Sequence, residues 1–155
     1  MRIRHTLMII GCGLFALEAL PVFAALGGNV ASVSADRLQM RAQLKGVTAS
    51  PGFTVQEIDD PSGTVIREYV SPSGTVFAVS WTGPIKPNLR QLFGSYFQQY
   101  VSASSTVRHG AATRRHFQLT QPDLVVESNG RMRAFYGRAY VPSLMPSSVT
   151  PADIH

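Results

Sequence analysis

Cysteine is almost missing from this chain of 155 residues. The single cysteine, Cys12, lies in an N-terminal segment that we expect to be removed. The remaining chain therefore has no disulfide, no cysteine-ligated metal and no thiol nucleophile. A chain of this size buries roughly two-thirds of its unfolded surface, so we expect one domain that is stabilised by its hydrophobic core.

The sequence patterns of common catalytic sites are missing as well. No H-E-x-x-H, G-x-S-x-G, P-loop or G-x-G-x-x-G pattern occurs. We expect no cofactor, and a binding or structural module in preference to an enzyme. A catalytic triad is defined by geometry and not by sequence order, so a hydrolase of cell-wall or glycan substrates, with His109 or His116 as base, is the alternative.

Long hydrophobic runs are limited to the N-terminus. Residues 1–24 combine a basic start, an apolar stretch over 7–20, Pro21 and the small residue Ala24. This order is typical of a secretory signal peptide, so we expect cleavage after Ala24 and a periplasmic or secreted protein. A membrane anchor is the competing interpretation, but the stretch is shorter than the roughly 20 residues that cross a bilayer. Lipidation at Cys12 would leave the apolar residues 13–24 on the mature chain.

The mature chain begins with β-rich segments. The ranges 53–58, 64–70 and 75–81 alternate or are rich in β-branched residues, and Pro-Ser-Gly-Thr-Val occurs at 61–65 and again at 72–76. Two similar turns between three strands predict an antiparallel meander, in which Arg67 and Tyr69 share one face and Ile66 and Glu68 share the other. Residues 34–44 fit either a short helix or an extended run, and 46–52 are expected to form a loop.

A helix is predicted to follow the meander. Asn88 is a suitable N-cap, and apolar residues recur at helical spacing from Leu89 to Val101. A strand is expected over 113–120, and the dipeptide Asn129-Gly130 predicts a hairpin between 124–128 and 131–141.

These elements predict an α+β fold, with an antiparallel sheet made of a β-meander and a C-terminal hairpin, and with one main amphipathic helix packed on one face. We expect residues 25–142 to form the domain and 143–155 to form an irregular tail. No second apolar run follows the leader, so we expect no transmembrane segment after cleavage.

Several motifs resemble an uncharacterised family of small exported proteins of Gram-negative bacteria, which is catalogued only as a domain of unknown function. The motifs are Ala25–Gly28, Arg67–Val70, Val76–Trp81, Gly83-Pro84 before Pro87, Leu92–Phe97, Asp123–Val126 and Gly137–Pro142. The resemblance covers nearly all of the mature chain. It implies one domain in the cell envelope or the medium, and it brings no catalytic residue, cofactor or partner.

Other candidate sites have simpler explanations. Metal binding by His109, His116 and His155 is not expected, because the usual ligand spacings are missing and arginines flank the first two. Adjacent Asp59 and Asp60 precede Pro-Ser-Gly, and such residues usually stabilise a turn and do not form a catalytic carboxylate pair. The aromatic residues suggest a sugar-stacking surface, but Trp81 is expected in the core and the helix stripe accounts for two others. The aromatic residues considered are Trp81, Tyr96, Tyr100, Tyr136 and Tyr140.

Arginine is concentrated towards the C-terminus, whereas lysine is scarce. The net charge is +5, and six arginines lie close together in the sequence. They are Arg108, Arg114, Arg115, Arg131, Arg133 and Arg138. Guanidinium groups bind phosphate and carboxylate with two parallel hydrogen bonds, which predicts an anion-binding face for lipid, lipopolysaccharide or acidic glycan groups, or for another envelope protein. Export argues against nucleic acid, and a basic face that only aids solubility is the competing interpretation.

Overall fold

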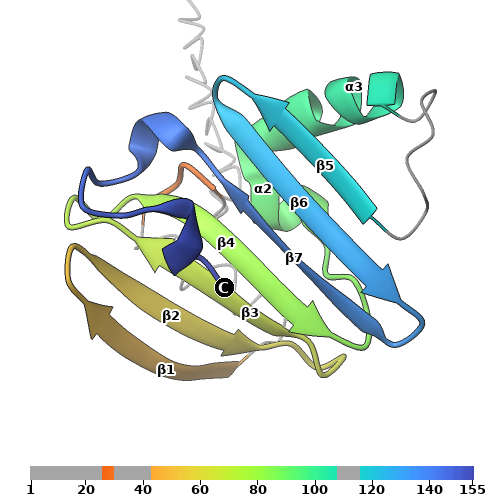
Figure 1. Ribbon diagram of the computed structural model, residues 1–155. Helices are drawn as coiled ribbons and strands as arrows, with labels where there is room; N and C mark the ends of the chain where they lie inside the picture. Colours follow the sequence, from red (N-terminus) through yellow and green to blue (C-terminus); the bar gives the residue numbers. More distant parts are fainter. Residues whose placement is uncertain (1–25, 30–42, 108–115) are drawn as a thin grey trace, which may run out of the picture.

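The computed structural model describes residues 26–29, 43–107 and 116–155 (Figure 1). One antiparallel sheet of seven strands has the order β1-β2-β3-β4-β7-β6-β5. Two meanders, β1 to β4 and β5 to β7, are thus joined edge to edge where β4 pairs with β7. The strands are β1 (Gln43–Ser50), β2 (Phe53–Asp59), β3 (Val65–Val70), β4 (Val76–Gly83), β5 (His116–Gln121), β6 (Leu124–Arg131) and β7 (Ala134–Tyr140).

The repeated Pro-Ser-Gly-Thr-Val sequence forms two turns with the same hydrogen bonds. Asp60 N–H donates to Thr64 O in the first turn, and Ser71 N–H donates to Thr75 O in the second. Gly63 and Gly74 have φ values of 82° and 81°, a backbone region that favours glycine. The predicted meander is therefore confirmed, with both turns built from the same local chemistry.

The predicted loop at 46–52 is wrong, because β1 runs through Ser50. This strand pairs with β2 along its length, with a bulge between Leu44 and Gly46. Its side chains are mostly exposed on both sides. An edge strand without a buried face carries no hydrophobic alternation, so its sequence gives no strand signal. Of the ambiguous segment 34–44, residues 34–42 lie outside the described part of the chain.

The helix after β4 begins where the sequence predicts and is interrupted once. The Asn88 side chain accepts hydrogen bonds from the N–H groups of Arg90 and Gln91, which caps the first turn. Gly94 has a φ of 48° and ends the first piece. The chain therefore forms α2 (Leu89–Phe93), a 3-10 turn η1 (Gly94–Tyr96) and α3 (Phe97–Val107). One main helical element on one face of an antiparallel sheet is the predicted α+β fold.

The second hairpin turns three residues later than its Asn-Gly dipeptide predicts. Arg131 pairs with Ala134, so Met132 and Arg133 form the turn, and Arg133 has a φ of 62°. A turn at Asn129-Gly130 would place Arg133 opposite Val126, which is fully buried on the helix side of the sheet. The observed register pairs Val126 with Ala139 instead. Burial of apolar side chains thus outweighs the local turn preference.

The helix face of the sheet, which α2 and α3 cover, contains the main core. A line of aromatic rings joins the two meanders through the helix, from β4 through α2 and α3 to β5. The ring centroids of Trp81 and Phe93 are 6.1 Å apart, those of Phe93 and Tyr100 5.1 Å, and those of Tyr100 and Phe117 5.7 Å. Aromatic pairs at such distances add to the stabilisation from apolar burial. Trp81 is only 1% exposed, as expected for a core residue.

Residues 142–155, here called the final segment, pack on the opposite face of the sheet, here called the second face (Figure 1). The segment contains two 3-10 turns, Pro142–Leu144 and Pro151–Asp153. Val149 and Ile154 are buried in a second cluster with Tyr69 and Phe77. The sheet is therefore packed on both faces.

Candidate functional site

A row of polar side chains crosses the second face of the sheet. Arg67 and Tyr69 alternate with buried Ile66 and Glu68 along β3, so the first two point away from the helices. Strand pairing then sets further polar residues level with Arg67. The polar row consists of Glu57, Arg67, Ser80, Arg138 and Glu127, on β2, β3, β4, β7 and β6 in that spatial order.

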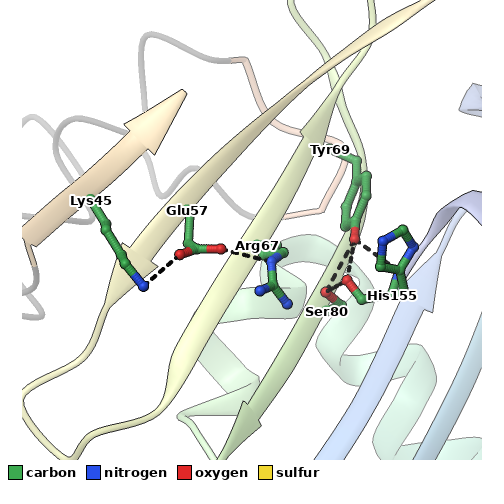
Figure 2. Close-up of polar contacts among 6 residues, drawn as sticks. All are labelled: Lys45, Glu57, Arg67, Tyr69, Ser80 and His155. Carbon is green, nitrogen blue, oxygen red and sulfur yellow. Dashed lines mark hydrogen bonds and ion pairs between the residues drawn. The ribbon is translucent and has the colours of Figure 1, made fainter. Parts of the chain in front are cut away.

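Two ion pairs connect one end of the polar row (Figure 2). Glu57 Oε1 lies 2.9 Å from Lys45 Nζ, and its Oε2 accepts a 2.8 Å hydrogen bond from Arg67 Nε. The hydrogen bond from Lys45, helped by Arg67, lowers the pKa of Glu57, and the same contact with Glu57 raises the pKa of Lys45. Glu57 therefore remains charged and links three strands.

The last residue of the chain, His155, is clamped onto the middle of the row (Figure 2). The Tyr69 hydroxyl donates to the main-chain oxygen of His155 at 2.6 Å and accepts from His155 N–H at 2.9 Å. The Ser80 hydroxyl donates to the same oxygen at 3.1 Å. Ser80 and Tyr69 are both buried. The two side chains thus position a main-chain segment.

Arg138 performs a similar task from β7. Its Nε and Nη2 lie 2.9 Å from Glu127 Oε2, and its Nη1 donates to the main-chain oxygens of Pro151 and Ile154. A guanidinium group binds several acceptors in one plane, so one side chain connects β6, β7 and the final segment. All three nitrogens of Arg138 are therefore engaged by the protein.

Two pockets flank His155 on the second face. The larger one, about 420 Å³, is called here the Tyr136 pocket. Its polar lining residues are Ser80, Thr82, Glu127, Asn129, Tyr136, Arg138 and His155. The smaller one, about 220 Å³, is called the Phe53 pocket and lies over Thr48, Glu57 and Arg67. The larger volume falls within the range of small-molecule sites.

The six predicted anion-binding arginines do not form one group among the described residues. Arg108, Arg114 and Arg115 lie outside those residues. Arg131 and Arg133 are exposed at the β6–β7 turn. Arg138 lies level with Glu127, about 13 Å along β6 from Arg131 at about 3.3 Å per residue. The structure thus separates two exposed arginines at a hairpin turn from one engaged arginine in the sheet.

The aspartate and histidine residues considered from the sequence as catalytic or metal-binding candidates are the next to place. Asp60 Oδ1 accepts from Ser62 N–H at 2.7 Å, so this aspartate supports the turn as expected. His116 Nδ1 hydrogen-bonds the Asn129 side chain on the exposed side of β5, and His109 lies outside the described residues. In the part of the chain that the structure describes, no three His, Cys, Asp or Glu side chains are grouped as a metal site.

Sequence reasoning missed the polar row and the clamp on His155. The alternation over 65–70 already placed Arg67 and Tyr69 on one face, and this was the available signal. The pairing of β4 with β7, which brings Arg138 beside Ser80, had no signal in local sequence. Ser80 Oγ contacts the Tyr69 hydroxyl and a main-chain oxygen, an arrangement suited to positioning and binding.

The fold and the second-face site define a small α+β domain with one antiparallel sheet, a helical cover and a clamped final segment. Residues 22–154 match the family described as "Protein of unknown function (DUF2844)", and the chain belongs to this family. No curated protein and no solved structure matches the chain. None of the helices in the described ranges is long and apolar enough to cross a bilayer.

Proposed function

We propose that this protein is an exported, non-catalytic binding module of the bacterial envelope, and that its β6–β7 turn contacts anionic envelope material. The observation that carries the proposal is the sequence Arg131-Met132-Arg133 at this turn. All three residues are exposed, and Met132 has an exposed fraction of 92%. An apolar side chain between two guanidinium groups suits a surface with phosphate groups above an apolar layer.

The start of β5 lies at the same end of the sheet as the β6–β7 turn, and the residues before it are also basic. β5 begins at His116, which pairs with Asn129 close to the β6–β7 turn. Arg114 and Arg115 directly precede His116 in the sequence. We therefore retain them, with Arg108, in the proposed anion-binding set.

Export is supported by a structural anchor just after the expected cleavage point. Leu26 is 1% exposed, and its N–H donates to Leu92 O at 3.0 Å. Gly27 N–H donates to Val76 O at 2.8 Å, which adds this short segment to the sheet. These anchors follow the expected cleavage point after Ala24 by only a few residues. The family match also begins close to this point, at residue 22.

The test is sedimentation of the mature protein with vesicles of phosphatidylglycerol or of phosphatidylcholine, and with purified lipopolysaccharide. The variant R131Q/R133N removes both charges, and asparagine tolerates the positive φ of position 133. A basic residue near an anionic surface contributes about 1 kcal/mol, so binding to phosphatidylglycerol should weaken about 30-fold.

The matched control is K86Q/R90Q, which removes two positive charges from exposed positions, one before α2 and one within it. This control should bind phosphatidylglycerol nearly as well as the wild type. Equal loss in both double variants would mean that net charge alone is responsible, and no binding to any of the three surfaces would contradict the proposal.

The hydrolase stays the alternative, with His109 or His116 as the base. Turnover of a cell-wall or glycan substrate that His116→Ala abolishes would favour it over the binding module.

A further inference from the structure

The Tyr136 pocket lies on the second face between β4, β7, β6 and the final segment. Most of its strand residues point away from the helices, and one wall is formed by Ile154 and His155. Tyr69, Ser80 and Arg138 hold that wall through main-chain atoms. The pocket is thus preformed, which lowers the entropic cost of binding a ligand.

The pocket is lined by a mixture of hydrogen-bond donors and acceptors. Glu127 supplies carboxylate oxygen, Asn129 supplies an amide, and Thr82 and Tyr136 supply hydroxyls. Within the described residues, neither of those two hydroxyls is engaged in a hydrogen bond with the protein. A ligand that both donates and accepts along its rim, as hydroxyl groups do, matches this set.

The charged side chains Glu127 and Arg138 of the pocket neutralise each other. Glu127 and Arg138 form an ion pair, and the remaining Arg138 nitrogen holds the final segment. A phosphate would have to displace these contacts, and it would lie beside the Glu127 carboxylate, which repels it. The pocket is therefore suited to an uncharged ligand.

Among the apolar lining residues Trp81, Tyr136 and Ile154, only Tyr136 is exposed. The Tyr136 side chain is 54% exposed although it belongs to a central hairpin, so its ring is available to a ligand. An aromatic ring offers a flat apolar surface beside its polar hydroxyl. A pyranose ring has an apolar face and a rim of hydroxyl groups, and it combines the two features that the pocket presents.

We propose that the Tyr136 pocket binds an uncharged saccharide, with one sugar ring against Tyr136 and its hydroxyl groups on Asn129, Thr82 and Glu127. This site contains neither arginine of the β6–β7 turn and does not depend on the anionic contact proposed above. A failure of vesicle binding and a failure of saccharide binding are therefore distinguishable.

The experiment is calorimetric titration of the mature protein with maltotriose and with a trimer of N-acetylglucosamine, with inorganic phosphate as the charged comparison. We expect at least one trisaccharide to bind and phosphate not to compete with it. Tyr136→Ala should weaken saccharide binding at least tenfold, and Tyr136→Phe, which keeps the ring, should weaken it less.

Thr48→Ala, in the Phe53 pocket, is the control and should bind as the wild type does. Thermal unfolding of each variant reports whether it is folded. Because Tyr136 is exposed, we expect its substitution to leave the fold intact. The proposal is overturned if neither trisaccharide binds at concentrations up to about 20 mM. It is also overturned if binding is equal in Tyr136→Ala and the wild type.

Discussion

Trp81 in β4 and Gly137 in β7 lie directly opposite each other, and the indole ring covers the glycine. An added Cβ at position 137 would come within 2.8 Å of Trp81 Cε2 and 2.6 Å of Glu127 O. Because Gly137 lacks a side chain, Trp81 can lie across the joint between the two meanders and reach Phe93.

Gly137→Ala should therefore destabilise the protein by about 3 kcal/mol, since neither the backbone oxygen nor the buried indole can move freely. Chemical denaturation followed by tryptophan fluorescence measures this loss. Gly46→Ala is the matched control, because its Cβ would meet no atom within 4 Å on the edge strand β1. Equal free energies of unfolding for the two variants would contradict the packing argument.

Phe93 and Phe97 share the helical stripe but differ in burial. Phe93 is fully buried between Trp81 and Tyr100, so Phe93→Ala should cost about 3–5 kcal/mol. Phe97 is partly buried, with the guanidinium of Arg90 4.8 Å from its ring centroid. Phe97→Ala should cost about 1–2 kcal/mol, less than the loss expected for the fully buried Phe93. Urea unfolding of both variants measures the two losses of unfolding free energy. A larger loss for Phe97→Ala than for Phe93→Ala would contradict this prediction.

The Tyr69 hydroxyl makes two hydrogen bonds to the main chain of His155. Tyr69→Phe removes both and keeps the ring, so it should cost about 1–2 kcal/mol and free the final segment. Hydrogen exchange over residues 151–155 should accelerate, and limited proteolysis should cut there first. In Tyr140→Phe, the control, the hydroxyl removed has no protein partner among the described residues, and exchange should be unchanged. Unaltered exchange in Tyr69→Phe would show that the clamp does not hold the segment.

Stability should fall in acid partly through Glu57. Its hydrogen bond from Lys45 and the nearby Arg67 lower its pKa, so the stabilisation is present above the unfolded pKa of about 4.3 and is lost as the pH falls through the folded value. Glu57→Gln should be less stable than the wild type near pH 6, by less than about 1 kcal/mol for a partly exposed pair. The difference should narrow as the pH falls below the unfolded pKa of about 4.3.

Thermal unfolding across this pH range measures the effect. A gap between Glu57→Gln and the wild type that is constant with pH would exclude a titrating carboxylate as its cause.

The sequence predicted the elements whose signals are local. The two glycine-containing turns and the Asn88 cap depend on a few adjacent residues, and each forms as expected. The exposed strand β1 has no buried face and gave no pattern. The second hairpin carried a strong local turn signal, but burial of Val126 opposite Ala139 decided its register.

The candidate site was less predictable because it depends on contacts distant in sequence. Arg138 was singled out for its charge, whereas its engagement with Glu127 and the final segment required the pairing of β6 and β7 and the position of residues 151–155. The clamp on His155 joins residues from β3, β4 and the end of the chain. No short window of sequence contains these three parts together.

The pairing of β4 with β7 has a consequence for the order in which the strands can fold. If the chain folds from its N-terminus, we expect the first meander to form from neighbouring turns before residues 134–140 are available to pair with the free edge of β4. Until then, β4 has an unpaired edge and apolar side chains that are buried only in the folded protein. Such an edge can pair with strands of other chains. The pairing of β7 with β4 is therefore the step at which we expect a chaperone to protect the newly made chain. Without that protection, unpaired β4 edges of different chains would aggregate at high concentration.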